Sequence, residues 1–403
     1  MAEKSLYSSG TVDLSRQAVV ILGVPIDDLS TDQTLQRIDQ LVSDGRRAQR
    51  THQVATANVD FIVNALIDPE VRLILQEASL TTADGMPLVW AARLLGVNLA
   101  GRVAGADLVP LLVAQAAQKG QSVFFLGGAV GVAARAADIL KQRHPELIVA
   151  GVLSPPFSSV LEMDPSIVDA VKAAHADILL VAFGNPKQEK WISMHKHELG
   201  VPVAMGVGGS LDFIAGSTTR APGWMQHTGL EWLHRMLHNP RRLVRRYVVD
   251  FFIFGSFLFQ QWWRMRSQSR PAATQPIGDP LLIQGFGVLS LNSGLTVQNI
   301  SLFENNVSRL LEQTPHLILD LKNVNFLDSS AIGRLIHFSQ CARLKGGELY
   351  LAAVPHKIWK NLQFLKLGQY LKFVPSLEEV LQQPFYIKKH STAPVRFELS
   401  ESN

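Results

Sequence analysis

Polar residues that could bind a substrate or move a proton follow several apolar runs in the first half of this chain. Thr56 and Asn58 stand two residues apart at the end of one run, so in an extended strand their side chains point to the same side. Asp84 follows another run and precedes a Gly-x-Pro helix entry, where a carboxylate can act as a general base or cap the helix. Taken alone, these positions favour the helix cap.

Two further motifs carry side chains suited to an anion or a polar ligand. Arg102 lies between glycines just before a predicted helix start, where it could bind a phosphate or form a surface salt bridge. The motif FGNPKQEKW at residues 183–191 places Gln188 between two lysines after an apolar run. Each motif could equally be an ordinary turn.

Glycine-rich turns follow two other apolar runs and are candidates for binding a nucleotide phosphate. They contain Gly127 and Gly128 in one turn and Gly208 and Gly209 in the other. Bare backbone N–H groups at such turns can approach a phosphate closely. The first turn is not G-x-G-x-x-G, and no acidic residue follows it at the expected distance after a clean second strand, so we disfavour an NAD-dependent oxidoreductase.

The sequence offers no evident metal site. It has no D-x-D pair of the kind that many sugar-nucleotide enzymes use to hold a divalent metal, and no Cys/His cluster with zinc spacing. We therefore expect no metal and no cofactor. A diphosphate bound here would have to be neutralised by arginines and backbone donors.

Arginines are concentrated in one segment of the chain. The whole chain carries +4, but residues 235–270 hold eight arginines and one acid, a local balance of +7 that leaves −3 elsewhere. They enclose YVVDFFIFGSFLFQQWW at residues 247–263, which is too short and too polar for the roughly 20 apolar residues of a spanning helix. We favour a helix at a membrane interface. The alternative, a buried helix between two domains, does not explain two basic flanks.

The composition excludes several classes of protein. With 403 residues, 47% hydrophobic and 18% charged, the chain can bury a large core, so it is neither wholly disordered, nor collagen-like, nor a disulfide scaffold. Its length suits two or three domains. The single cysteine, Cys341, cannot form an internal disulfide, and the first 16 residues lack the apolar core of a signal peptide. We expect a cytosolic protein.

The first 230 residues alternate apolar runs with helical patterns, which predicts an α/β domain with a Rossmann-like, largely parallel sheet. The expected strands are residues 18–24, 54–59, 122–126, 147–153, 178–183 and 203–207. Ligands of such sheets bind beyond the carboxyl ends of the strands. Thr56 and Asn58, Gln188 and the two glycine-rich turns lie at or just beyond the ends of these runs.

A second, small α/β domain is predicted after a linker. The segment SQSRPAATQPIGDP at residues 267–280 has a linker's content of proline and small polar residues. Beyond it we expect strands at 281–291, 317–321 and 348–353 and helices at 297–311, 330–344 and 377–382.

Taken together, the motifs of the first domain resemble the WecG/TagA/CpsF family of bacterial glycosyltransferases over roughly residues 18–246. The matching blocks are T-x-N at 56–58, A-D-G-x-P at 83–87, G-R-x-x-G-x-D-L at 101–108, F-G-x-P-x-Q-E-x-W at 183–191, G-V-G-G-S-x-D-F-x-A-G at 206–216, and a run from R-A-P at 220–222 through G-L-E-W-L-H-R at 229–235 to P-R-R-L-V-R-R at 240–246. Six blocks in order are specific, so the resemblance outweighs the separate cap and turn interpretations.

The resemblance implies both an activity and roles for individual residues. Members of this family transfer a hexose, often N-acetylmannosamine, from a UDP-sugar to a lipid-linked acceptor at the cytoplasmic membrane face, with inversion and without an obligatory metal. Asp84 matches the catalytic base, and Arg102 is the second residue that we place in catalysis. The remaining matches line the active site or belong to an arginine-bearing C-terminal appendage that contacts the diphosphate: Thr56, Asn58 and Gln188, and Arg235, Arg242 and Arg245.

The second domain resembles a STAS domain over about residues 281–383. Its marker is FLDSSAIGRL at residues 326–335, after the expected strand at 317–321. In anti-sigma factor antagonists the first serine of this motif is phosphorylated, and it corresponds to Ser329 here. Ala331 replaces a glycine of that pattern. A phosphorylation switch and a simple helix cap by Asp328 or Ser329 both remain open.

These observations predict an inverting, metal-independent UDP-hexose glycosyltransferase of polysaccharide or exopolysaccharide assembly. The expected divisions are a disordered start at 1–17, the transferase domain at 18–233, a membrane-docking appendage at 234–266, the linker at 267–280, the STAS domain at 281–384 and a tail at 385–403. Its expected substrates are a UDP-hexose of N-acetylmannosamine or glucose type and a polyprenyl-diphosphate-linked sugar. Its other expected partners are the inner membrane face, a protein bound by the STAS domain and further copies of the chain in a homo-oligomer, but no nucleic acid. The alternative is a non-catalytic nucleotide-sugar-binding regulator, against which the retained Asp84, Arg102 and Gln188 argue.

Overall fold

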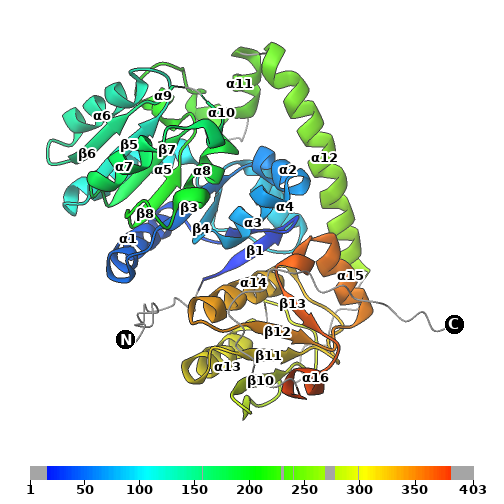
Figure 1. Ribbon diagram of the computed structural model, residues 1–403. Helices are drawn as coiled ribbons and strands as arrows, with labels where there is room; N and C mark the ends of the chain where they lie inside the picture. The colour runs from blue at the N-terminus through cyan, green and yellow to red at the C-terminus, as the bar shows by residue number, and fades with distance from the viewer. Residues whose placement is uncertain are drawn as a thin grey trace, which may run out of the picture.

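Two α/β units are joined along one side by a single long helix in this computed structural model (Figure 1). The structure describes residues 16–156, 158–227, 231–238, 240–267, 277–297 and 299–382. The predicted start up to residue 15, linker residues 268–276 and the tail from residue 383 lie outside the described residues.

The N-terminal unit is built on a six-stranded sheet in which every pairing is parallel, as the sequence predicts. Its strand order is β4-β3-β8-β7-β5-β6. The strands are β3 (His52–Ala57), β4 (Leu80–Ala83), β5 (Ser122–Gly127), β6 (Ile148–Leu153), β7 (Ile178–Ala182) and β8 (Val203–Gly206). Because all six run the same way, their carboxyl ends form one edge, and the motifs from the sequence lie along it.

Helices cover both faces of this sheet. They are α1 (Thr31–Ala48), α2 (Val59–Ile67), α3 (Pro69–Glu77), α4 (Met86–Leu94), α5 (Gly105–Gln118), α6 (Val132–Arg143), α7 (Ser166–Ala173), α8 (Lys187–His195) and α9 (Ser210–Ile214), with a 3-10 turn at Val160–Glu162. The apolar residues of α1, α5 and α6 share one core with the sheet, and those of α7 and α8 form a separate core. The strands other than the edge strand β6 are buried along nearly their whole length, which explains their nearly continuous hydrophobicity.

The first apolar run does not join this sheet, contrary to the simple reading of residues 18–24 as one of its strands. It forms an antiparallel hairpin of β1 (Ala18–Ile21) and β2 (Val24–Asp27). The hairpin turns at Leu22 and Gly23, both with positive φ, as a two-residue primed turn requires. Leu-Gly is not a common sequence for such a turn, so the sequence of residues 18–24 predicts one continuous strand. The hairpin lies between the two units (Figure 1).

The C-terminal unit has a five-stranded sheet in the order β13-β12-β11-β10-β9, antiparallel only at the β9–β10 edge. Its elements are β9 (Leu281–Ile283), β10 (Phe286–Ser290), α13 (Ile300–Gln313), β11 (Leu317–Asp320), α14 (Ser329–Leu344), β12 (Leu349–Ala352), α15 (His356–Phe364), a 3-10 turn at Leu367–Gln369, β13 (Lys372–Val374) and α16 (Leu377–Gln382). The expected strand at 281–291 is thus a hairpin, and the sequence missed α15 and β13.

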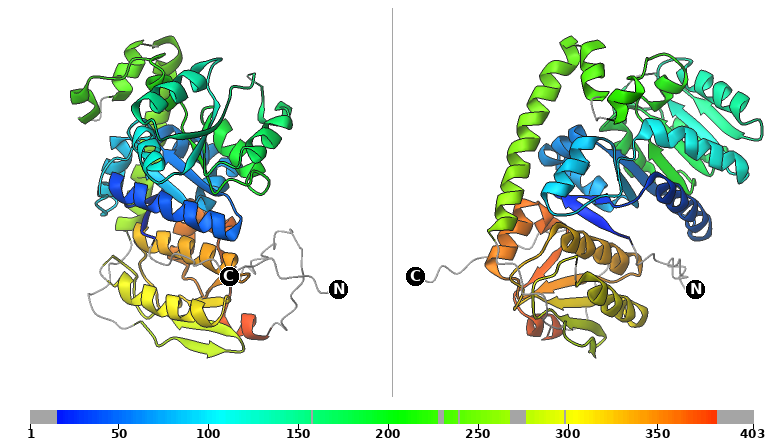
Figure 2. Two further views of the ribbon diagram at one scale, coloured as in Figure 1. Left: turned by 90° about the vertical axis from the view of Figure 1, so that its left-hand side faces the viewer. Right: turned by 180° about the vertical axis from the view of Figure 1, so that it is seen from behind.

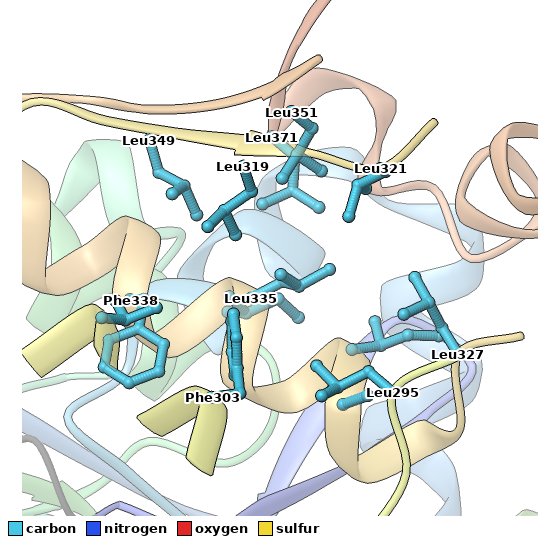
Figure 3. Packing of buried hydrophobic residues seen from close by; sticks show 14 of the residues in the cluster. Leu295, Phe303, Leu319, Leu321, Leu327, Leu335, Phe338, Leu349, Leu351 and Leu371 are labelled. Carbon is cyan, nitrogen blue, oxygen red and sulfur yellow. The ribbon is translucent and has the colours of Figure 1, made fainter. Parts of the chain in front are cut away.

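Leucines of the C-terminal sheet form its core with two aromatic rings of the covering helices. In Figure 3 the side chains of Leu319 and Leu351 lie on the face of the sheet that is turned toward Phe303 of α13 and Phe338 of α14. The two rings meet edge to face with centroids 5.6 Å apart. This core belongs to the C-terminal unit and leaves the opposite side of α14 to face the hairpin.

The basic, aromatic segment forms one straight helix that spans both units. After α10 (Gly223–His227) and α11 (Glu231–His238), α12 (Pro240–Arg266) runs 27 residues, about 40 Å at 1.5 Å per residue. Two opposite views place its start beside the N-terminal unit and its end beside α15 (Figures 1 and 2). Among the described residues, no helix is long and apolar enough to span a membrane.

The two faces of α12 differ in burial. The inner face is buried and includes Phe254, Leu258 and Gln261. The outer face exposes Phe259 (57%) and Trp263 (62%), among other apolar side chains. The helix therefore packs the two units together and also presents an aromatic surface.

Candidate active site

Asp84 lies at the carboxyl edge of the sheet, directly after β4. Its backbone N–H donates to Ala57 O at 2.7 Å, which continues the pairing of β3 and β4 by one residue. Its Oδ2 accepts the N–H of Gly105, the first residue of α5, at 3.4 Å. The half-buried carboxylate therefore stands at a helix N-terminus, where the helix dipole stabilises its negative charge.

Thr56 comes close to this aspartate because α5 begins with a glycine. A Cβ at Gly105 would stand 3.1 Å from Thr56 Oγ1 and 3.4 Å from Ser210 Oγ. The structure thus gathers Asp84, Thr56 and Ser210 around one glycine. The sequence placed Thr56 in the site but did not single out Ser210, which is the first residue of α9 after β8.

Asn58 caps α2, as its position at a strand end suggested. Its Oδ1 accepts the N–H of Phe61 at 3.2 Å. The first turn of the helix carries Asp60, which accepts hydrogen bonds from Asn185 Nδ2 at 2.6 Å and from Arg246 Nε at 2.7 Å. This carboxylate connects the start of α2 to the loop after β7 and to α12.

Arg102 is held rigidly at the same edge. The neighbouring Val103 donates its N–H to Ala83 O at 2.9 Å and accepts the Thr82 hydroxyl at 3.1 Å. The guanidinium then forms an ion pair with Asp107 at 2.8 Å. Its other terminal nitrogen, Nη1, lies 3.3 Å from Glu231 Oε2, at the start of α11.

A second arginine, Arg220, completes this network. Its Nη1 lies 2.7 Å from Asp107 Oδ1, and its Nε lies 3.9 Å from Glu231 Oε1. Both Nε and Nη2 are buried, and neither has a hydrogen-bond partner in the part of the chain that the structure describes. Burial alone would lower the pKa of Arg220, but the hydrogen bond and charge of Asp107 outweigh it and raise that pKa. The Glu231 carboxylate therefore lies between two guanidinium groups, each suited to an anion.

Asp107, Arg220 and Glu231 were not among the predicted site residues. A signal for them was present, because each belongs to one of the six blocks that carried the resemblance. The three residues are far apart in the sequence, so their contact could not be predicted from it. Only the packing of α11 on the sheet edge brings Glu231 to the two arginines.

Gln188 is placed to hold two loops together. Only 2% of its surface is exposed, and its Oε1 accepts the N–H groups of Gly184 at 3.1 Å and Gly208 at 3.0 Å. Its Nε2 donates to Glu189 Oε1 at 2.8 Å. Burial raises the pKa of Glu189 to about 8, so this carboxyl is largely protonated at neutral pH. In this arrangement Gln188 joins the ends of β7 and β8.

The predicted phosphate-binding glycines occupy different parts of the edge. Gly127 and Gly128 follow β5 with φ of +99° and +75°, a region that favours glycine. In the strand order β5 is four positions from β4, which corresponds to about 19 Å at roughly 4.8 Å per strand. Gly208 and Gly209 lie nearer, after β8. A ligand must be extended to reach both Asp84 and Gly127.

The predicted appendage arginines lie in α11 and α12. The side chains of Arg235 and Arg242 fall outside the described residues, and Arg245 is exposed. Arg246, which was not predicted, is the arginine that contacts Asp60. Within the described ranges, no cluster of three His, Cys, Asp or Glu side chains suited to a metal is found.

Ser329 lies far from this edge, in the C-terminal unit, and is fully buried. The helix cap is Asp328, whose Oδ1 accepts the N–H of Ala331 at 2.7 Å. The cap interpretation is therefore right for Asp328. Ser329 itself faces the end of α12.

Comparisons with known proteins agree with this division of the chain. Residues 19–268 match the model of the glycosyl transferase WecG/TagA/CpsF family, and residues 281–380 match the STAS domain model. A curated relative from Bacillus spizizenii, named N-acetylglucosaminyldiphosphoundecaprenol N-acetyl-beta-D-mannosaminyltransferase, is 32% identical over 226 residues, which cover 56% of this chain and 84% of the relative. A Staphylococcus aureus protein of the same name is 32% identical over 239 residues, 59% of this chain and 91% of that one.

Among solved structures, a putative anti-sigma factor antagonist from Thermotoga maritima matches with a TM-score of 0.24 and 21% identity. The match covers 26% of this chain and 90% of that one.

Proposed function

Because the chain belongs to the WecG/TagA/CpsF family of glycosyltransferases, we propose that it transfers a hexose from a UDP-sugar to a polyprenyl-diphosphate-linked sugar. The donor is of the N-acetylmannosamine or glucose type, and the product enters polysaccharide or exopolysaccharide assembly. The names of the two relatives specify N-acetylglucosaminyl-diphosphoundecaprenol as acceptor and N-acetylmannosamine as the transferred sugar. The observation that carries the proposal is the Asp84 carboxylate beside the network of Arg102 and Arg220.

The proposed reaction is a single displacement with inversion. Asp84 takes the proton of the acceptor hydroxyl while that oxygen forms a bond to the anomeric carbon of the donor. The bond from the anomeric carbon to the diphosphate oxygen breaks, and UDP leaves with the electron pair. The position of Asp84 at the start of α5 supports this role, since a helix N-terminus stabilises the negative charge of the carboxylate that accepts the proton.

Negative charge develops on the leaving diphosphate, and arginines are proposed to stabilise it in place of a metal. The Nε and Nη2 atoms of Arg220 form one edge of a guanidinium, the edge that binds a phosphate through two parallel hydrogen bonds. The Glu231 carboxylate lies between this edge of Arg220 and the guanidinium of Arg102. Fixed donors in a water-poor site stabilise a transition state more than they would in water.

The lipid-linked acceptor requires the site to work at a membrane surface, and α12 is the proposed contact. Its outer face carries exposed apolar side chains along its length, with an exposed arginine near each end: Val248, Phe251, Phe252, Phe259 and Trp263, and Arg245 and Arg266. Aromatic rings enter the acyl boundary while guanidinium groups remain with anionic headgroups. We therefore place the protein on the inner face of the cytoplasmic membrane.

The test is UDP release from a panel of UDP-hexoses, with and without a polyprenyl-diphosphate-linked N-acetylglucosamine in mixed micelles. We expect release only when one donor and the lipid acceptor are both present, and loss of release in Asp84→Asn. Asp138→Asn, an exposed change on α6, is the matched control and should behave as wild type. Binding of a UDP-sugar without release under any acceptor would instead indicate the nucleotide-sugar-binding regulator.

A further inference from the structure

A single buried glutamine connects three elements where the two units meet. Gln261 of α12 is 0% exposed, and its Nε2 donates to Val20 O while its Oε1 accepts the N–H of Leu22, both at 2.9 Å. The side-chain amide thus pairs with the edge of β1 much as a neighbouring strand would. The same Nε2 lies 3.4 Å from Ser329 Oγ, which also contacts Met265 Sδ at 3.4 Å. We call this contact of β1, α12 and α14 the joint.

Glycines show how closely the backbones approach at the joint. A Cβ at Gly333 of α14 would stand 2.2 Å from Ala18 O of β1, and one at Gly23 would stand 2.2 Å from Leu365 O. Neither position has room for any side chain, because the atom that blocks it belongs to the backbone of the other unit. The two units therefore fit together at two separate points.

Two buried arginines, each paired with a carboxylate of its own unit, donate hydrogen bonds across the joint. Arg16 binds Asp27 through Nε at 2.6 Å and Nη2 at 2.8 Å, and its Nη1 donates across the joint to Gln340 Oε1 of α14 at 3.1 Å. Arg334 of α14 forms an ion pair with Glu304 of α13 at 2.5 Å and donates across the joint to Arg16 O. Buried donors that lose their acceptors are costly, so these two hydrogen bonds favour the observed contact of the two units.

The end of α12 is also packed against α15. The ring of Phe364 stacks on Phe257, with centroids 6.2 Å apart and an interplanar angle of 23°. The guanidinium of Arg264 lies 4.8 Å from the centroid of the same Phe364 ring. The last three turns of α12 thus contact both β1 and the STAS domain (Figure 1).

We propose that the STAS domain is an internal clamp on α12: the surface around Ser329 takes β1 and α12 of the same chain as its partner and so positions the appendage over the active site. From Gln261, α12 runs to Arg246, which contacts Asp60 at the site edge. The preceding helix α11 brings Glu231 to Arg102 and Arg220. The partner of this STAS surface is therefore the transferase domain itself.

The proposal has a direct consequence for Ser329. Its hydroxyl faces Gln261 and Met265 without exposed surface, so it is closed to modification while the joint is formed. A negative charge at this position would be buried against the amide of Gln261 and the thioether of Met265. Such a charge opens the joint and releases α12.

The experiment compares Ser329→Asp with Ser330→Asp, which adds the same charge one residue later in the same helix turn, at a half-buried position. Hydrogen exchange of the Leu22 amide, a donor to Gln261, reports on the joint. Exchange of the α11 amides and the rate of sugar transfer report on the appendage. We expect Ser329→Asp to speed Leu22 exchange at least tenfold, to speed α11 exchange and to slow transfer at least fivefold, with Ser330→Asp close to wild type.

Faster Leu22 exchange without any change at α11 or in transfer would overturn the clamp, and so would unchanged Leu22 exchange. The transfer rate tests the clamp only if the proposed function is right, whereas α11 exchange tests it independently. If the wild-type protein shows no transferase activity, the proposed function is refuted and the clamp is still tested by α11 exchange. The amides of Leu321 and Val207, which donate within the two sheets, detect general unfolding. If these two amides also exchange faster in Ser329→Asp, the variant is unfolding generally, and Gln261→Ala is measured in its place by α11 exchange and sugar transfer. General unfolding of Gln261→Ala as well would refute the clamp.

Discussion

The carboxylate of Glu231 lies between two arginines, 3.3 Å from Arg102 Nη1 and 3.9 Å from Arg220 Nε. Glu231 is the first residue of α11, and the two arginines belong to the edge of the sheet. The same guanidinium groups are the donors that we assign to the leaving diphosphate. A substrate phosphate and Glu231 would therefore compete for them, which connects substrate binding to the position of the appendage.

Replacing Glu231 by glutamine should tighten UDP binding. The neutral amide competes less well for Arg102 and Arg220 than a carboxylate does, and a partly exposed ion pair is worth about 1 kcal/mol, or about fivefold in Kd. Calorimetric titration with UDP measures the change. Glu70→Gln removes a surface ion pair with Lys190 and serves as the control. Weaker binding by Glu231→Gln would mean that the carboxylate supports the phosphate site instead of competing with the phosphate.

Replacing Arg220 by lysine should slow transfer although the positive charge is kept. An ammonium group cannot present the paired Nε and Nη2 donors, so transition-state stabilisation of the diphosphate falls. We expect kcat/KM to fall about 10²-fold, as for loss of one fixed donor. Arg46→Lys, at an exposed pair with Asp177, should leave it unchanged. Full activity in Arg220→Lys would show that this residue only anchors Asp107.

Replacing Asp84 by asparagine should remove the chemical step and spare nucleotide binding. The amide keeps the shape of the side chain but cannot accept the proton, and general-base catalysis typically contributes 10²- to 10⁴-fold. Turnover and the Kd for UDP are measured on the same preparation, and the Kd should change by no more than about threefold. Turnover near that of wild type would remove Asp84 from the role of base.

The sequence predicted the parallel sheet because its strands other than the edge strand β6 are buried on both sides and are therefore largely hydrophobic. It missed the hairpin at β1 and β2, since Leu22 and Gly23 adopt positive φ without a familiar turn sequence. It gathered Thr56 and Asp84 at one edge from the rule for strand ends. It could not place Arg220 against Glu231, nor Ser329 against Gln261, because these contacts depend on how α11 and α12 pack.

Stability should fall as the pH rises through the titration range of Glu189. Burial raises the pKa of this carboxyl to about 8 in the folded protein, against an ordinary value of 4.5 for glutamate. Between these values the folded state holds a proton that the unfolded state has lost, so the free energy of unfolding decreases by up to about 1.4 kcal/mol per pH unit. Glu189→Gln removes this dependence. Thermal unfolding is measured at pH 5.5 and 7.5. The Tm of the variant minus the Tm of wild type should be larger at pH 7.5 than at pH 5.5. Exposed Glu146→Gln should show no such shift.

The outer face of α12 can be tested without disturbing its inner face, because Phe259 and Trp263 are both more than half exposed. Changing both to serine removes two rings from the proposed membrane contact while Gln261 keeps its bonds to β1. Even partial insertion of two rings is worth about 2 kcal/mol, so binding to anionic vesicles should weaken about 30-fold. The matched control changes Trp90 and Leu94, two exposed apolar residues of α4, to serine. The alternative is that the aromatic face contacts a second copy of the chain, and sedimentation of the same variants without lipid tests it. Unchanged vesicle binding with loss of self-association would show that this face binds another copy and not the membrane.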